Sequence, residues 1–344
     1  MSSLVVRVDP YFVTTITVNP MTRISEMSSS EVLESTRPQD LGLKDSNNVL
    51  ELVVFLMDQT EIPLSIRGKT RELTANKVLD DVFNQLMSLN MRFDSEYKQL
   101  FSIWITSPYL ELQLQPSHRP FSLLAKWDKF LRKHGPPELT ENPILIEKDE
   151  PTLSFQRNVF CNQSIEPEIA EEDIGALKLL YFEAKLNVLD GRYPTEDFEQ
   201  LAAYQMAIDL GVYQKTEYTV EYIRQHLKEL IPFNYIKPSD GKKLNGLIRT
   251  LSRSSPSLRC AQNIFQKYKE LSKEKLSEYK LLRSYLEICW SIPCYGSAYF
   301  SAQIERPIKS KIDSIVNHFD LEVWVAVNQT GLHLISKEKP VCRH

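Results

Sequence analysis

Residues 49–161 alternate short apolar runs with one long amphipathic segment. The runs at 49–58 and 61–66 flank a polar turn, a pattern typical of a β-hairpin. Residues 72–87 then repeat apolar side chains at helical spacing, which predicts a helix with Thr74 as its N-cap. Further elements are expected in this part of the chain, namely strands at 100–107, 109–116 and 152–160 and a short helix at 121–135.

The pattern changes to successive helices between residues 168 and 291. Apolar residues recur at helical spacing over 172–191, and Gly191 is expected to end that helix. These segments together predict a small helical bundle. Its later helices are expected from Thr195 to Gly211, over 218–232, after N-caps at Ser239 and Ser257, and at 272–290, the longest.

Residues 292–344 return to a strand pattern. Strands are expected at 295–304, 321–327 and 332–336, with the last two joined by a turn, and no helix is expected. These 53 residues lie near the lower end of domain sizes. We therefore expect a partial β lobe, interpreted as a shortened form with exposed strand edges that is the least ordered part after the N-terminal arm. The alternative is that Trp324 and its neighbours pack on the first lobe.

Composition sets the broad class of the protein. The 344 residues are 42% hydrophobic and 25% charged, which is typical of a globular chain with several domains. Residues 1–48 contain 13 Ser or Thr and no sustained periodicity, which predicts a disordered arm. We find no membrane-spanning run and no signal peptide, and the five scattered cysteines are typical of a reducing compartment. These features predict an intracellular soluble protein.

Catalytic and cofactor motifs are missing from the sequence. The ten glycines form no G-x-G-x-x-G, no G-x-S-x-G and no Walker loop. Cys289 and Cys294 have no matching Cys or His pair to complete a zinc site, so two packed cysteines are expected. His333 alternates with leucines and is expected to face solvent. We therefore expect no enzyme activity, no catalytic residues, no metal and no cofactor.

Charge is distributed unevenly along the chain, whose net charge is −4. Residues 237–283 hold twelve Lys or Arg and four Asp or Glu, a balance of +8, whereas 141–173 hold nine acids and two bases, or −7. The basic stretch is interpreted either as solvated helix faces or as a weak surface for anionic lipid headgroups. Nucleic acid fits poorly because the overall charge is negative. The residues assigned to the lipid surface are Lys242, Lys243, Arg249 and Arg253.

Several segments together resemble the FERM domain family. LLYFEAKLNVLDGRYP (179–194) is similar to the family segment that ends in a G-R-x-P turn, and LAAYQMAIDLGVY (201–213) to the helix that follows it. IPCYGSAYF (292–300) resembles the family's "YG-x-x-F" start of the third lobe, and FQRNVF (155–160) also matches relatives.

The resemblance implies an α+β fold of three lobes: a ubiquitin-like β-grasp, a helical bundle and a truncated PH/PTB-like β lobe. The corresponding divisions are a 1–48 arm, a 49–161 first lobe, a 168–291 middle lobe and a 292–344 partial third lobe.

The resemblance also implies a function. It indicates a non-catalytic adaptor that binds cytoplasmic tails of membrane proteins, with iRhom pseudoproteases and a cell-surface sheddase implied by the most similar branch. Such a protein would be cytoplasmic and peripheral at the inner face of the plasma membrane. The alternative is a junctional scaffold that acts as an effector of a Rap-type small GTPase. Residues 49–66 contain no Lys or Arg, which makes a small GTPase unlikely as a partner. We expect tail binding through the usual third-lobe groove to be lost or weakened.

Overall fold

The computed structural model describes residues 49–89, 91, 94–136, 138–211, 213, 217–232, 235, 255–304, 321–337 and 342–343. Several features predicted from the sequence lie outside these residues: the arm at 1–48, the N-cap at Ser239, and the lipid-binding residues Lys242, Lys243, Arg249 and Arg253.

The first lobe is built on a mixed sheet of five strands in the order β2-β1-β5-β3-β4. The predicted hairpin forms, and Val54 of its first strand pairs with Ile62 of its second. The last strand, β5, runs parallel to β1 and antiparallel to β3, so it lies at the centre of the sheet. The strands are β1 Val49–Phe55, β2 Glu61–Arg67, β3 Phe101–Thr106, β4 Glu111–Gln113 and β5 Thr152–Arg157.

Helix α2 (Ala75–Ser88) covers one face of this sheet. Thr74 caps it as predicted, since its hydroxyl accepts the Lys77 N–H at 3.4 Å. The apolar stripe of Val78, Val82 and Leu86 is buried against the strands. Four short helices complete the first lobe, α3 Pro120–Leu124, α4 Trp127–His134, α5 Glu138–Glu141 and α6 Ile144–Glu147.

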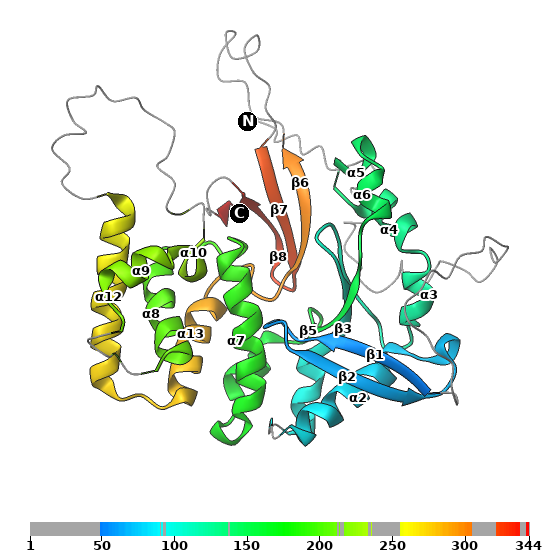
Figure 1. Ribbon diagram of the computed structural model, residues 1–344, viewed down its shortest axis with the longest axis horizontal. Coiled ribbons are helices and arrows are strands. Elements are labelled where there is room, and N and C mark those ends of the chain that lie inside the picture. The colour runs from blue at the N-terminus through cyan, green and yellow to red at the C-terminus, as the bar shows by residue number, and fades with distance from the viewer. Residues whose placement is uncertain are drawn as a thin grey trace, which may run out of the picture.

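The middle lobe is a bundle of helices in which α7 lies on the side that faces the first lobe. Helix α13 packs on α7 and α8, while α12 packs on α8 and α9. Helix α7 also contacts β5 of the first lobe, which explains why it is buried on more than one side. Figure 1 shows α7 standing between the first sheet and the other helices. The helices are α7 Ile174–Leu189, α8 Phe198–Asp209, α9 Val220–Gln225, α10 Leu227–Leu230, α12 Pro256–Glu274 and α13 Glu278–Trp290.

Several helices differ from those predicted. The segments 121–135 and 218–232 were each expected to be one helix, but each forms two, α3 and α4 in the first case and α9 and α10 in the second. The segment 272–290 is not one helix, because Lys275 adopts a left-handed conformation with φ of 49° and Ser277 caps a new helix. The cap of α12 is Ser255 rather than Ser257. Helix α8 begins after Asp197, because the hydroxyl of Thr195 accepts the Asp197 N–H and closes a turn before the helix.

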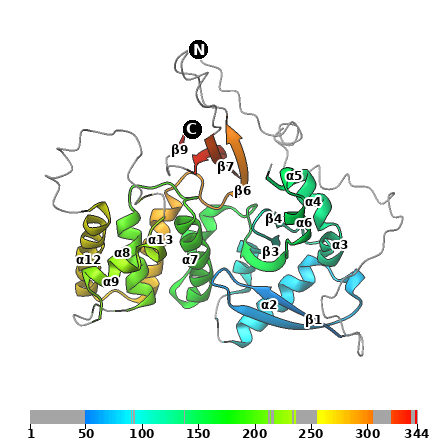
Figure 2. The same cartoon turned by 45° about the horizontal axis from the view of Figure 1, so that its top comes forward.

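The third lobe is an antiparallel sheet in the order β6-β7-β8-β9. The three strands predicted before Lys337 form, and Leu334 and Ile335 of β8 also pair with a short fourth strand that follows it. No helix occurs in the third-lobe residues that the structure describes. Figure 2 shows β6, β7 and β9 together beyond the other two lobes. The strands are β6 Ala298–Ile304, β7 Leu321–Asn328, β8 Gly331–Ser336 and β9 Cys342–Arg343.

Both faces of this third sheet bury apolar side chains. Tyr299, Ala326 and Ile335 lie on one face and belong to the core shared with the first two lobes. The opposite face forms a second, smaller cluster, which consists of Ala302, Ile304, Val323 and Val325. The third sheet is therefore packed on the rest of the molecule through one face.

Candidate functional site

A buried ion pair joins the end of the first sheet to the segment before the middle lobe. Arg157 is the last residue of β5, and its Nε donates to Oε1 of Glu166 at 2.6 Å. Glu166 lies on the 3₁₀ helix η3 (Gln163–Glu168) and is completely buried. Burial alone would lower the pKa of Arg157, but the Glu166 carboxylate, together with Tyr295 and Glu183, outweighs it and raises the pKa.

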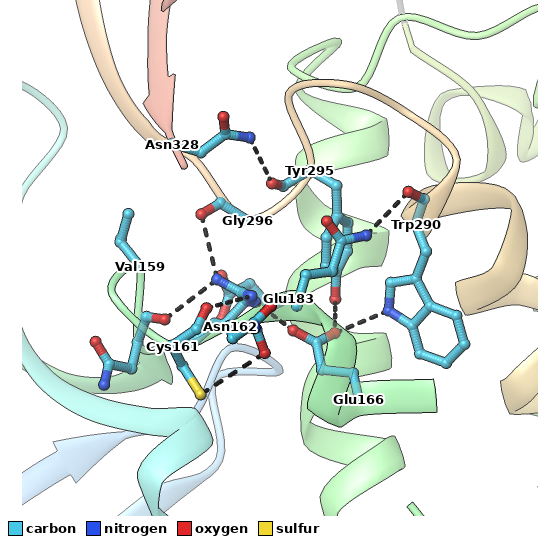
Figure 3. A network of polar contacts seen from close by, with 12 residues as sticks. Val159, Cys161, Asn162, Glu166, Glu183, Trp290, Tyr295, Gly296 and Asn328 are labelled. Atoms are coloured by element: carbon cyan, nitrogen blue, oxygen red, sulfur yellow. Dashed lines mark hydrogen bonds and ion pairs between the residues drawn. The ribbon is translucent and has the colours of Figure 1, made fainter. Parts of the chain in front are cut away.

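The second carboxylate oxygen of Glu166, Oε2, accepts hydrogen bonds from the other two lobes (Figure 3). The indole Nε1 of Trp290, at the end of α13, donates to Oε2 at 2.8 Å. The hydroxyl of Tyr295, in the segment that leads to β6, donates to the same atom at 2.6 Å. One buried carboxylate thus accepts hydrogen bonds from the first lobe, the middle lobe and the start of the third lobe. These donors compensate the cost of burying its negative charge.

The guanidinium of Arg157 contacts the third lobe directly. Its Nη1 donates to the carbonyl of Gly296 at 3.3 Å, and its Cζ lies 5.4 Å from the centre of the Tyr295 ring. Gly296 has φ of 62°, and a Cβ added there would lie 2.5 Å from Arg157 Nη1. Glycine is required at this position because only it combines the left-handed backbone with room for the arginine.

A second carboxylate completes this cluster. Oε2 of Glu183, on α7, accepts the backbone N–H of Arg157 at 2.5 Å. Burial raises the pKa of Glu183 to about 7, and the carboxylates of Glu166 and Glu111 raise it in the same direction. The Arg157 N–H and guanidinium oppose the shift.

A second arginine, the partly buried Arg192, follows α7 in the G-R-x-P turn. Its Nη2 and Nη1 donate to the two oxygens of Glu111 on β4, at 2.6 and 3.1 Å. This bidentate geometry matches the planar guanidinium to the carboxylate. The same guanidinium lies 4.7 Å from the ring of Trp324 and 5.1 Å from that of Tyr299, both in the third sheet. Arg192 therefore contacts all three lobes.

We call Arg157, Glu166, Glu111, Arg192 and Trp324 the interlobe junction. The Arg157–Glu166 pair is buried and the Arg192–Glu111 pair is partly buried, and because both pairs are made within the protein they serve to fix the orientation of the lobes. The alternative that Trp324 packs on the first lobe is met indirectly, because its ring lies against Arg192, and the same guanidinium binds Glu111 of the first lobe.

The other residues considered from the sequence occupy structural positions. Cys289 and Cys294 are both buried, and burial raises the pKa of the Cys289 thiol. Within the described residues, no group of three His, Cys, Asp or Glu could hold a metal ion. The prediction that His333 faces solvent was wrong, because it is 5% exposed and bonds Thr330 Oγ1 at 2.9 Å. Its strand alternates as predicted, but the face that carries His333 is the one packed on the core.

Sequence reasoning missed the junction, although the signal was present. Arg157 lies in the segment FQRNVF and Arg192 in the G-R-x-P turn, and both segments were used for the family resemblance. An arginine at the end of a buried strand has to find an acidic partner, but the partners Glu166 and Glu111 are not marked by spacing.

Comparisons with known proteins agree with this architecture. The FERM central domain model matches residues 168–300. FERM domain-containing protein 8 of Xenopus tropicalis is 30% identical over 325 residues, which cover 91% of this chain and 68% of that protein. The human protein of the same name is 32% identical over 299 residues, which cover 85% of this chain and 61% of that protein. This chain belongs to the FERM domain family.

Solved structures show the same FERM fold. The C-terminal MyTH4-FERM domain of human myosin 7b, solved in complex with the harmonin-a PDZ3 domain, matches 86% of this chain and 51% of its own, with a TM-score of 0.55 and 16% identity. The α+β, three-lobed FERM architecture expected from the sequence is confirmed. FERM domains bind partner proteins and are generally non-catalytic. No helix among the described residues is long and apolar enough to cross a membrane.

Proposed function

We propose that this chain is a non-catalytic FERM adaptor that binds the cytoplasmic tail of a membrane protein of the iRhom kind and so stabilises a cell-surface sheddase complex. The observation that carries the proposal is the similarity to FERM domain-containing protein 8, which is 30% identical and extends over 91% of the chain. The chain spans about two thirds of the length of that frog relative.

The interlobe junction supports an adaptor role. Because Arg157 and Arg192 each contact more than one lobe, the surfaces of the three lobes keep fixed relative positions. A tail that touches two lobes then loses little of its binding free energy to ordering the protein. We propose that the protein acts in the cytoplasm, peripheral to the inner face of the plasma membrane.

Lipid headgroups are a second, weaker partner in this proposal. The +8 balance of residues 237–283 provides the attraction, with Lys242, Lys243, Arg249 and Arg253 as the contact residues. Each well-placed base contributes about 1 kcal/mol near an anionic membrane, which biases residence but does not anchor a protein. The tail therefore provides most of the affinity.

The domain divisions at 49–161, 168–291 and 292–344 are part of the proposal. Limited proteolysis should cut before residue 49 first and should spare 173–190, because α7 is packed on both the first sheet and α13. Early cleavage within α7 would contradict these divisions.

A pull-down tests the function. Full-length chain on beads is offered the cytoplasmic tail of an iRhom and, separately, a Rap GTPase loaded with GTP. We expect the tail to be retained in a saturable manner and the GTPase to wash away. Retention of the GTPase without the tail would support the junctional effector role instead and would overturn the proposal.

A further inference from the structure

A small pocket opens on the first lobe, far in sequence from the junction. It lies where β2 ends and α2 begins, and its volume is about 180 Å³. The residues that line it are Leu50, Ile66, Arg67, Gly68, Lys69, Glu72, Leu73, Thr74 and Lys77.

The inner wall of the pocket is apolar. Leu50, Ile66 and Leu73 line it and are themselves buried in the core of the first lobe. Pockets for cofactors or drug-sized ligands measure roughly 300–1,000 Å³, whereas a cavity of roughly 150 Å³ holds one benzene ring. The pocket therefore fits one large apolar side chain and is too small for a cofactor.

The rim of the pocket is basic. Residues 67–77 contain Arg67, Lys69, Arg71 and Lys77 against the single acid Glu72, a balance of +3 in a chain whose net charge is −4. Within the described residues Arg67 and Arg71 are exposed and form no ion pair.

The other two bases are paired with acids but are still exposed. Lys69 and Glu72 are 3.9 Å apart with side chains 75% and 70% exposed, so water screens this contact. Lys77 pairs with Asp81 at 2.6 Å and is itself 53% exposed. The rim therefore keeps a positive surplus that is open to an acidic partner.

The backbone around the pocket disfavours two kinds of partner, a small anion and an added β-strand. The first amides of α2 are already satisfied, since Ala75 N donates to the His118 carbonyl and Asn76 N to the Pro116 carbonyl. A small anion such as phosphate thus finds no free helix N-terminus here. The neighbouring edge strand β2 carries Pro63, which lacks an N–H and disfavours pairing with an added strand.

We propose that this pocket is a docking site for an acidic peptide segment that inserts one large apolar side chain between β2 and α2. The apolar wall receives the side chain, and Arg67, Lys69 and Lys77 attract the flanking carboxylates. The site lies on the first lobe alone, so it stands apart from the tail-binding role proposed above and holds for an acidic peptide from any protein.

Fluorescence anisotropy with designed peptides tests this site on the full chain. The probe is a labelled peptide with one phenylalanine between runs of Asp and Glu, and two companions replace the phenylalanine with alanine or the acids with lysines. The double variant Arg67→Glu/Lys69→Glu is compared with Lys129→Glu/Arg132→Glu, which makes the same charge change at exposed positions on α4.

We expect the acidic phenylalanine peptide to bind the unmodified chain and the α4 variant alike, and to bind the Arg67/Lys69 variant about tenfold more weakly at low salt. Both companion peptides should also bind about tenfold more weakly. Equal binding of the alanine peptide would overturn the role of the pocket, and equal loss in both variants would mean non-specific attraction. Loss of binding to anionic vesicles in the Arg67/Lys69 variant, with no peptide binding, would assign the surface to lipid and overturn the proposal.

Discussion

Arg192 and Trp324 meet through a cation–π contact in which the guanidinium carbon lies 4.7 Å from the centre of the indole ring. The ammonium nitrogen of Lys337 lies 4.1 Å from the centre of the same indole ring. Arg192, in the turn after α7, thus contacts the third sheet through Trp324, while the same guanidinium donates a hydrogen bond to Glu111 of the first sheet. The relative position of the three lobes depends on side chains that are far apart in sequence.

The Arg157–Glu166 pair should be costly to break on one side only. Arg157→Met leaves the Glu166 carboxylate buried without its cation, and such a loss costs about 3–5 kcal/mol of unfolding free energy. The double variant Arg157→Met/Glu166→Gln should recover a large part of that loss. Urea unfolding measures the unmodified chain, both single variants Arg157→Met and Glu166→Gln, and the double variant. The control Arg71→Met, at an exposed position, should change stability by less than about 0.5 kcal/mol. A double variant as unstable as the sum of the two single changes would contradict the coupling.

Glu183 should make stability fall with rising pH near neutrality. Its folded pKa of about 7 lies above the unfolded value of about 4.3, so the folded state binds the proton more tightly. Its contribution to stability is therefore present at low pH, is lost as pH rises toward 7, and stays lost above it. Glu183→Gln should raise stability at pH 8 by on the order of 2 kcal/mol and change little at pH 5.

Thermal unfolding at both pH values measures this effect. Glu171→Gln, which removes the same charge at an exposed position, serves as the control. An equal gain at pH 5 and pH 8 would mean that the gain does not come from the proton on Glu183.

Lys275 offers a stabilising change. It is exposed and left-handed, with φ of 49° and ψ of 44°, a conformation that favours glycine. Lys275→Gly should therefore stabilise the protein by about 1 kcal/mol. Lys273→Gly, inside the last turn of α12, should destabilise it by about 1 kcal/mol. Melting temperatures that move in the same direction for both variants would refute the conformational explanation.

The proposed lipid surface gives a salt-dependent prediction. Changing Lys242, Lys243, Arg249 and Arg253 to Glu should weaken sedimentation with anionic liposomes, and the difference should be largest at low salt. Neutral phosphatidylcholine liposomes are the control and should sediment neither protein. If the unmodified chain does not bind anionic liposomes, the lipid surface is wrong.

Elements with strong local patterns could be predicted from the sequence. The stripe of Val78, Val82 and Leu86 and the cap at Thr74 determine α2, and the apolar runs around β1 and β2 determine the hairpin. The break at Lys275 could not be predicted, because a lysine in the left-handed conformation has no marker in the sequence.

The features that the sequence does not predict depend on contacts formed only in the folded chain. The buried face of β8 cannot be known from alternation alone, which is why His333 was placed in solvent when the sheet packs it inward. Glu111 and Arg192 belong to separate lobes, and Glu166, nine residues after Arg157, lies on a segment whose path the sequence does not mark, so only the folded chain brings each pair together. The basic rim begins at Arg67, one residue after the segment 49–66, which has no Lys or Arg.

Hydrogen exchange followed by mass spectrometry tests the central claim, that Arg157 and Arg192 hold the third sheet on the other two lobes. Ala326 and Ile335 are fully buried in the shared core, so the amides of 321–336 should exchange as slowly as those of 173–190 in the unmodified chain. Arg192→Lys keeps the charge but loses the bidentate contact to Glu111, and it should speed exchange in 321–336 while 173–190 stays protected. Rapid exchange of 321–336 in the unmodified chain would contradict the claim and restore the expectation, drawn from the sequence, of a poorly ordered third lobe.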